Sequence, residues 1–366
     1  MKKFKQFVLF IIVSISIFGC DSNDDNDATT LCNSNFIAFT STKYFPNATD
    51  DFDIYKYPKS TTLDLSNGAN LTLNANPFIT AEYLFDNTTL YNTSANEFIC
   101  HLPTHSRFIK YNMSTGVVSN NNYPINSGIR KPFLLNGVLK FLKYSNYVNS
   151  YSTTSSQNYI SSYDIQIADE NGVGSGTTYT VPFLESDGVQ IENSSAFVIS
   201  NKLFFLAGCS VVIIDLSTNI VQKKNLYAYD YNNNRLFTRG LHLKDNNTLV
   251  FFKGEALSSY NIKIEKIDIA NLLSSSTNYA PQTIFNFNDA TITGSNPGVS
   301  IGLLINRMDG SAFAFDKCDN NYYFTSDDGA PNAPEGYIYE LRTNSNAMNI
   351  YPKVTGKHFF GIGIQQ

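Results

Sequence analysis

Basic side chains at comparable places along the chain are the residues best suited to bind a ligand. Arginine and lysine attract carboxylate and phosphate groups, and the planar guanidinium can donate two parallel hydrogen bonds to either group. The chain has 26 lysines and arginines against 31 acids, so a concentration of cations would stand out in a mildly acidic protein. The candidates are Arg130, Lys131, Arg239, His242, Lys244, Arg307 and His358. The plainer interpretation is that these side chains pair with acids or face solvent.

Sequence motifs of known enzyme mechanisms do not accompany these cations. The four histidines do not form an HExxH spacing, and the sequence has no GxSxG, no P-loop and no GxGxxG after a strand. His101 and His105 flank a turn and could bind a metal with a third ligand. Asp327, Asp328 and Glu335 could hold Ca²⁺, although solvated turn residues are the plainer interpretation. We therefore assign no catalytic residue, no metal ligand and no required cofactor.

Strand pairs that recur along the chain indicate what would position the cations. Apolar runs such as Leu203–Leu206 follow a turn asparagine, and each is followed by a second strand that ends in a polar turn. The segments 108–116 and 211–219 nearly superimpose. Equivalent points at Tyr57, Asn112, Ala168, Asp215, Asp268 and Leu341 recur about every 57 residues, a period that suits four antiparallel strands with loops.

This period predicts an all-β fold, a six-bladed β-propeller with four-stranded antiparallel blades in a single domain over residues 33–366. The last strand, 358–364, has no later partner and is expected to pair beside Phe36 in blade one, which closes the ring and removes two open sheet edges. Gly361 and Gly363 are expected to mark close backbone packing near the axis. Seven blades, a β-sandwich or two small β domains are the alternatives, and the segment 270–300 is interpreted as an insertion.

The propeller would bring the cations together. The predicted innermost strands lie near 129–134, 236–243, 301–308 and 358–364, and their ends would line the ligand funnel at the axis. The candidate ligand-binding residues Arg130, Lys131, Arg239, His242, Arg307 and His358 all fall on them or at their ends.

The N-terminus has the layout of a secretory signal. Three lysines precede an apolar run, Phe7–Phe18, which is shorter than a membrane-spanning helix needs. Gly19-Cys20 resembles the lipobox of bacterial lipoproteins, although Phe18 is bulkier than that motif usually allows. The resemblance implies a signal peptide over 1–19 and lipidation of Cys20, whereas an ordinary cleaved signal is the alternative. The acidic run 21–27 is interpreted as part of a flexible tether over 20–32.

Composition and cysteine usage narrow the class further. A pI near 5.4 argues against nucleic-acid binding, and the abundant aromatic residues argue against disorder. Cys32, Cys100, Cys209 and Cys318 could form disulfides in an oxidising envelope or stay as buried thiols, and the sequence does not select a pairing.

Both the acidic run and the repeat resemble those of known proteins. The acidic run is similar to the stretch after the lipidated cysteine in surface lipoproteins of Bacteroidota, and the repeat looks like TolB-like and NHL-like six-bladed propellers. The first resemblance implies an outer-membrane protein that faces outward, with a periplasm-facing orientation as the alternative. The second covers roughly residues 33–366 and carries no functional residues with it.

Three classes of function fit these features. The first is a non-enzymatic binding or accessory module for a glycan, a siderophore or another anionic small molecule, or for an outer-membrane protein partner. The second is a propeller hydrolase or lyase that acts on polysaccharide or lactone, which would need paired carboxylates or Ca²⁺ at one mouth of the channel. The third is a scaffold subunit of an envelope complex.

Overall fold

The structure is a computed structural model, and the predicted signal peptide, Cys20 and the tether lie outside the residues that it describes. Residues up to Cys32 form a unit separate from Asn33–Gln366, and only the second unit is described here. The described residues are 34–41, 52–59, 63–70, 89–94, 97–102, 107–112, 114–124, 127–153, 157–187, 195–228, 236–255, 262–295, 313–327, 335–356 and 358–365.

The described residues form six sheets, here numbered along the chain and given in order of pairing. Sheet 1 contains β26 (His358–Gln365), β1 (Ser34–Ser41), β2 (Phe52–Lys59) and β3 (Ala69–Asn70). Sheet 2 contains β4 (Thr89–Ser94), β5 (Glu97–Leu102), β6 (Arg107–Asn112) and β7 (Val118–Asn122). Sheet 3 contains β8 (Ile129–Leu135), β9 (Val138–Ser152), β10 (Gln157–Ala168) and β11 (Tyr179–Pro182).

The second half of the chain repeats this plan. Sheet 4 contains β12 (Phe197–Ile199), β13 (Lys202–Ala207), β14 (Ser210–Asp215) and β15 (Ile220–Asn225). Sheet 5 contains β16 (Leu236–Asp245), β17 (Thr248–Glu255), β18 (Lys263–Asp268) and β19 (Gln282–Asn286). Sheet 6 contains β21 (Phe313–Asp316), β22 (Asn321–Asp327), β23 (Glu335–Arg342), β24 (Ala347–Ile350) and β20 (Thr291–Gly294), with β25 (Val354–Thr355) also on β23.

Helices are few in this part of the chain. They are α2 (Ile269–Ser274), which Asp268 caps by accepting a hydrogen bond from the Asn271 N–H, and the 3₁₀ turns η3 (Glu185–Asp187) and η4 (Phe287–Asp289). No described helix is long and apolar enough to cross a membrane.

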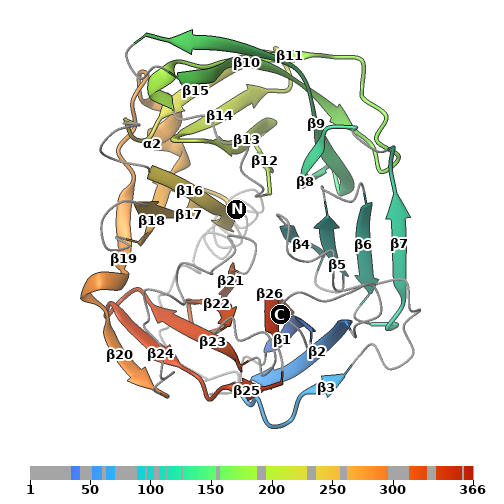
Figure 1. Ribbon diagram of the computed structural model, residues 1–366, viewed down its shortest axis with the longest axis vertical. Helices are drawn as coiled ribbons and strands as arrows, with labels where there is room; N and C mark the ends of the chain where they lie inside the picture. Colours follow the sequence, from blue (N-terminus) through green and yellow to red (C-terminus); the bar gives the residue numbers. More distant parts are fainter. Residues whose placement is uncertain are drawn as a thin grey trace, which may run out of the picture. The chain divides into compact units, whose positions relative to one another are not determined.

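Contacts between neighbouring sheets close them into a ring, so the fold is a β-propeller (Figure 1). β4 contacts β26 and β8, β8 contacts β12, and β21 contacts both β16 and β26. Sheets 4 and 5 meet through β13 and β16. The innermost strands of the six sheets are therefore β26, β4, β8, β12, β16 and β21.

The predicted closure by the last strand is confirmed. β26 pairs antiparallel with β1, with Phe36 opposite Ile364 and Ala38 opposite Ile362. The prediction for Gly363 also holds, because a Cβ at this position would lie 1.9 Å from Cε1 of the buried Phe98 in sheet 2. Only the bare backbone of a glycine lets the closing strand approach that ring so closely.

The apolar core lies between the sheets rather than in one centre, and this explains the sequence of the middle strands. Leu203 and Phe205 pack toward sheet 3, whereas Phe204 and Leu206 pack toward sheet 5. Because both faces of β13 are buried, the strand reads as a continuous apolar run. The outer strand β15 has one face in solvent and alternates between exposed and covered residues.

Sheet 6 differs from the predicted four-stranded antiparallel blade. β20 comes from the predicted insertion and pairs parallel with β24, so it covers the outer edge of sheet 6. Another part of that segment is not an insertion, because it forms β19, the fourth strand of sheet 5. Covering an edge in this way satisfies backbone groups that would otherwise be unpaired.

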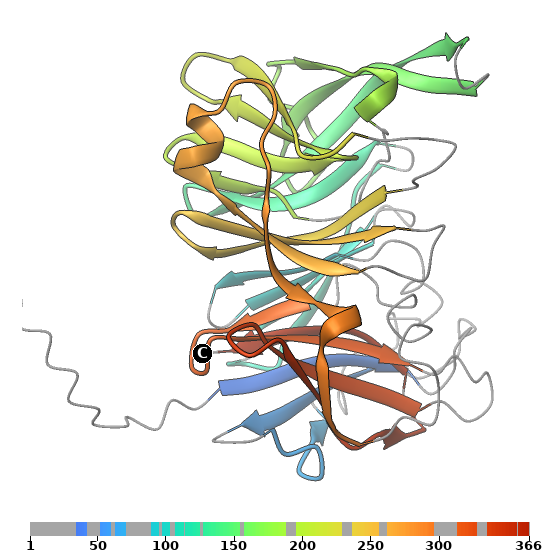
Figure 2. The ribbon, with the colours of Figure 1, turned by 90° about the vertical axis from the view of Figure 1, so that its left-hand side faces the viewer.

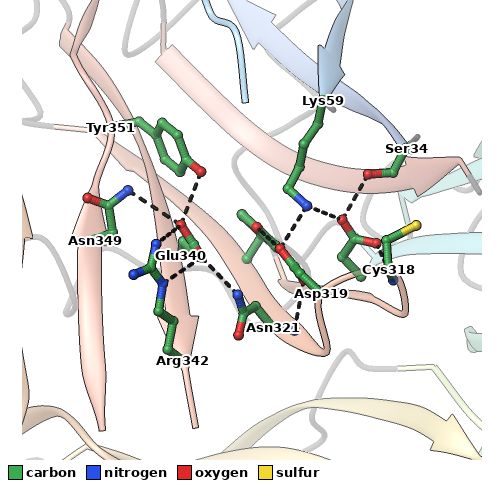
Figure 3. Close-up of polar contacts among 11 residues, drawn as sticks. Ser34, Lys59, Cys318, Asp319, Asn321, Glu340, Arg342, Asn349 and Tyr351 are labelled. Atoms are coloured by element: carbon green, nitrogen blue, oxygen red, sulfur yellow. Dashed lines mark hydrogen bonds and ion pairs between the residues drawn. The ribbon is translucent and has the colours of Figure 1, made fainter. Parts of the chain in front are cut away.

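A buried ionic network joins sheets 1 and 6, where the ring closes (Figure 3). Lys59 Nζ lies 2.8 Å from Asp316 Oδ2 and 2.7 Å from Asp319 Oδ2. Ser34 Oγ donates to Asp316 Oδ2 at 2.8 Å, and the Cys318 N–H donates to Asp316 Oδ1 at 2.9 Å. The first strand of the propeller is thus tied to the turn after β21 by charge and by hydrogen bonds.

Two cysteines can be described. Cys318 is disulfide-bonded, and its partner lies outside the described side chains. Cys209 is a buried free thiol, and burial raises its pKa to about 12, with help from the nearby Asp187 charge. A thiol with so high a pKa is unreactive near neutral pH.

Candidate functional site

The predicted cations lie on innermost strands wherever the structure describes them. Arg130 and Lys131 are on β8, Arg239 and His242 are on β16, and His358 begins β26. The side chains of Arg239 and His358 are not among those described. Arg307 and the segment 301–308 also lie outside the described residues, and the innermost described strand of sheet 6 is β21.

The described cations do not form one continuous cluster. Arg130 belongs to sheet 3 and His242 to sheet 5, with sheet 4 between them in the ring. Lys131 is only 1% exposed, lies at a register shift of β8 with a φ of 28°, and has contacts of its own within the chain. Among the described candidates, Arg130 is therefore the one whose charged group is available to bind a ligand.

The guanidinium of Arg130 makes no hydrogen bond or ion pair within the described part of the chain, and its Nε is buried without a partner. Leaving a buried charged donor unsatisfied is costly, and native proteins rarely do so without a reason. A carboxylate or phosphate oxygen could accept a hydrogen bond from this donor, because the guanidinium donates from several N–H groups in one plane.

Polar atoms from sheet 2 and from the connection to sheet 3 lie in the same region as Arg130. His101, on β5, is buried, and its Nε2 lies 2.7 Å from the hydroxyl of Tyr123. Its Nδ1 is buried and has no hydrogen-bond partner among the described residues, and the same holds for the hydroxyl oxygen of Ser127, three residues before Arg130. The region thus has unused hydrogen-bonding capacity on three side chains.

Burial keeps His101 uncharged at neutral pH. It lowers the pKa of His101 to about 3, and the positive charge of Arg130 contributes to the shift. His101 also lies against Phe141, with ring centroids 5.1 Å apart. Its partner is therefore a tyrosine inside the core, which does not resemble a metal site, and His105 lies outside the described residues.

His242 has a similar environment in another sheet. Burial lowers its pKa to about 4, and the charge of Lys317 adds to this effect. Its ring lies 6.4 Å from that of Phe315, and Lys244 Nζ is 5.2 Å from the Phe315 ring centroid. His242 is therefore neutral near pH 7 and does not supply the positive charge that its position on an inner strand suggested.

We expect these two histidines to make the fold sensitive to mild acid. Their folded pKa values lie below the ordinary 6.5, so the unfolded chain binds protons that the folded chain does not, and stability falls as the pH drops below 6.5. Each histidine contributes up to about 1.4 kcal/mol per pH unit until its folded pKa is approached. Urea unfolding between pH 7.5 and 5 should show this slope, and His101→Gln and His242→Gln should each make it shallower. An unchanged slope in the double variant would contradict the assignment.

No cluster of histidine, cysteine or carboxylate side chains suited to a metal ion occurs among the described residues. The predicted Ca²⁺ ligands fall at the limit of these residues, because Asp328 and the side chains of Asp327 and Glu335 are not described. The possible Ca²⁺ site therefore stays a prediction.

Two tyrosines near Arg130 were not predicted as site residues. Tyr147 and Tyr151 on β9 are 41% and 62% exposed, respectively. Burial raises the pKa of the Tyr147 hydroxyl, and the charge of Arg130 opposes that rise, so the two groups lie within electrostatic range. The sequence feature that could have indicated them is the length of the run 138–152, which is longer than one strand of a blade requires.

Comparison with known proteins found similar solved structures at low sequence identity. No family model matches the sequence, and no curated protein matches it. A proposed 6-phosphogluconolactonase from Bacteroides fragilis is similar over 93% of this chain and 99% of its own, with 11% identity and a TM-score of 0.46. A second one, from Bacteroides uniformis, covers 91% and 99%, with 8% identity and a TM-score of 0.46. Virginiamycin B lyase from Staphylococcus aureus covers 87% and 88%, with 12% identity and a TM-score of 0.37. At these identities, the activities of those proteins are not assigned to this chain.

Proposed function

We propose that this chain is a lipid-anchored envelope protein whose propeller binds an anionic ligand at Arg130 without transforming it. The observation that carries this proposal is the guanidinium of Arg130, which lies on an innermost strand and has no acidic partner among the described residues. Several other basic residues in the described part of the chain pair with acids, as Lys59 does with Asp316 and Arg342 with Glu340.

The surroundings of Arg130 favour an anion over a neutral ligand. Burial is the main cause of the pKa shifts of His101, Tyr123 and Tyr147, and the positive charge of Arg130 acts on each of the three groups. The neutral imidazole of His101 and the hydroxyl of Ser127 can add hydrogen bonds without opposing a negative charge. A carboxylate or a phosphate would thus accept charge-assisted hydrogen bonds from the guanidinium of Arg130.

We expect Arg130→Gln to weaken binding of such a ligand by at least about tenfold, because a charge-assisted hydrogen bond contributes about 1.5–3 kcal/mol. Isothermal titration with citrate, inorganic phosphate and glucuronate would measure the effect. Arg342→Gln is the matched control, because that arginine is held by Glu340 in sheet 6 and its loss should leave binding unchanged. Equal affinity of the Arg130 variant and the wild type for every anion would contradict the proposal.

The anchor and the location form a separate part of the proposal, supported by the lipobox-like Gly19-Cys20 and the acidic tether. We expect Cys20→Ser to abolish incorporation of labelled fatty acid and to release the chain from the membrane fraction, because the proposed anchor is lipid attached to the Cys20 sulfur. Protease added to intact cells should degrade the wild-type protein if it faces outward. An unlabelled wild-type chain, or a Cys20 variant that stays in the membrane fraction, would contradict lipidation at this residue.

The alternative of a propeller hydrolase or lyase can be tested with the same preparation. The described innermost strands end in carboxylates at Asp245 and Asp316, but Asp316 is bound by Lys59 and Ser34. Turnover of a lactone or a glycoside by the purified chain would contradict binding without transformation.

A further inference from the structure

A two-stranded ribbon projects from sheet 3 beside Arg130. β9 has 15 residues and β10 has 12, whereas β8 pairs with β9 only as far as Lys143 and β11 pairs with β10 from Ser162 onward. The remaining parts of β9 and β10 pair with each other, from Val148 opposite Ser162 to Ser152 opposite Gln157. Figure 2 shows this green ribbon extending beyond the neighbouring strands.

The ribbon carries exposed aromatic side chains. Among the side chains that the structure describes, the exposed tyrosine or phenylalanine rings are Tyr147 and Tyr151, and both are on β9. Side chains two and four residues apart on a strand lie on one face, so Tyr147, Asn149 and Tyr151 share a face, whereas Val148 lies on the other. The two rings are thus separated by about 13 Å along the strand. The Tyr147 ring lies 6.0 Å, centroid to centroid, from the buried Tyr163 ring, which fixes its position, and the exposed parts of the Tyr147 and Tyr151 rings favour a binding surface.

The base of the ribbon is tied to the segment that carries Arg130. The Tyr144 N–H donates to the Gly128 carbonyl at 2.9 Å, and Arg130 itself lies opposite Leu142 in the ladder. Gly128 has a φ of 72°, and a Cβ there would lie 2.1 Å from the Tyr144 carbonyl oxygen. A side chain at residue 128 would therefore push the ribbon away from the arginine. Backbone contacts thus hold the base of the ribbon next to the segment that carries Arg130.

The side chain between the two tyrosines is an amide. Asn149 is exposed and makes no side-chain hydrogen bond within the described residues, in contrast to Asn146, whose Nδ2 donates to Asp164 at 2.8 Å. An amide both donates and accepts, so it suits hydroxyl groups. The face therefore offers two flat apolar surfaces and a group that can bind hydroxyls, and the ribbon starts next to a cation that has no partner among the described residues.

We propose that the anionic ligand is an acidic saccharide, whose carboxylate binds Arg130 and whose ring faces pack on Tyr147 and Tyr151. This rests on the proposed function and specifies its ligand. The C–H face of a sugar ring is apolar and packs on an aromatic ring, while its hydroxyls reach the Asn149 amide. A small inorganic anion would not contact the tyrosine rings, and a neutral sugar would not pair with Arg130. A chain of uronic acid residues would, because it presents a carboxylate and a ring face on each unit.

The test is isothermal titration of the mature chain with the trimer of galacturonic acid, with neutral galactotriose and citrate as comparison ligands. We expect the acidic trimer to bind at least about tenfold more tightly than either, because the two ring contacts add roughly 0.5–1.5 kcal/mol each to the charge interaction. The Tyr147→Ala/Tyr151→Ala variant should lose about tenfold in affinity for the acidic trimer and keep its affinity for citrate. The Tyr147→Phe/Tyr151→Phe variant keeps both rings and should bind the trimer nearly as wild type does.

Controls separate this inference from the proposed function. Val148→Thr changes the opposite face of the same ribbon and should leave binding unchanged, and thermal unfolding of each variant checks that it is folded. If citrate binding depends on Arg130 but the acidic trimer binds no more tightly than citrate, or the double alanine variant binds it equally well, the saccharide inference is overturned and the anion site stands. If no anion binds in an Arg130-dependent way, the proposed function itself fails.

Discussion

Replacing Lys59 with methionine is expected to destabilise the propeller by about 3–5 kcal/mol, because it leaves a buried carboxylate without its cation. Asp316 is fully buried and Lys59 is 3% exposed, so water cannot take the place of the lost ammonium group. Methionine fills a similar volume, which keeps the change electrostatic. A loss of this size is a large part of the 5–15 kcal/mol that holds an ordinary domain folded.

The pH dependence of this pair follows from both partners. Burial would raise the pKa of Asp316, but the hydrogen bond from Lys59 and others hold it below the ordinary value. Burial would lower the pKa of Lys59, but hydrogen bonds to Asp316 and Asp319 raise it above the ordinary value. The Asp316 contribution is lost as the pH falls through its depressed pKa, and the Lys59 contribution is lost as the pH rises through its elevated pKa. The pair is therefore fully stabilising between about pH 4 and pH 10.

Urea unfolding at pH 7.5 measures the effect of Lys59→Met, and Lys202→Met is the matched control. Lys202 pairs with Asp215 on a hairpin of sheet 4, where both side chains are partly exposed, so its loss should cost at most about 1 kcal/mol. Equal destabilisation by the two variants would show that burial does not set the value of the Lys59 pair.

Gly363→Val is expected to destabilise the fold by about 3 kcal/mol, at the upper end of what overpacking a core costs. The Cβ of valine would begin 1.9 Å from Cε1 and 2.4 Å from Cζ of Phe98, and that ring is 1% exposed and cannot move freely. Relief requires β26 to shift away from sheet 2, which weakens its pairing with β1 and opens the ring. Thermal and urea unfolding would both report the loss.

A double-mutant cycle with Phe98→Leu identifies the cause. If the ring of Phe98 is the obstacle, Gly363→Val should cost clearly less in the Phe98→Leu background than in the wild type, so the two changes should be strongly non-additive. Additive free energies would mean that the valine acts elsewhere, for example on the strand itself.

Much of the propeller could be predicted from the sequence because its signals are local. An apolar run buried on both faces, such as Leu203–Leu206, followed by a turn with asparagine, is a pattern that each blade repeats. Asn136, Asn201 and Asn320 adopt positive φ at hairpin turns, as the frequent asparagines indicated. The closing strand followed from the same count, because a strand without a later partner must pair with an earlier edge.

The sequence alone thus determined the strand-pair repeat, the propeller, its closure by residues 358–364 and the presence of cations on the innermost strands. Only the tertiary structure decided which cation is unsatisfied. It placed the acids of sheet 6 against Lys59, and it buried His242, which is therefore neutral near pH 7. It also left Arg130 without a partner among the described residues, next to the base of a ribbon with two exposed tyrosines. The physical reason is that pairing and protonation depend on which side chains meet across neighbouring sheets. Those neighbours are far apart in the chain, as Ser34 and Asp316 are, and no local pattern encodes their meeting.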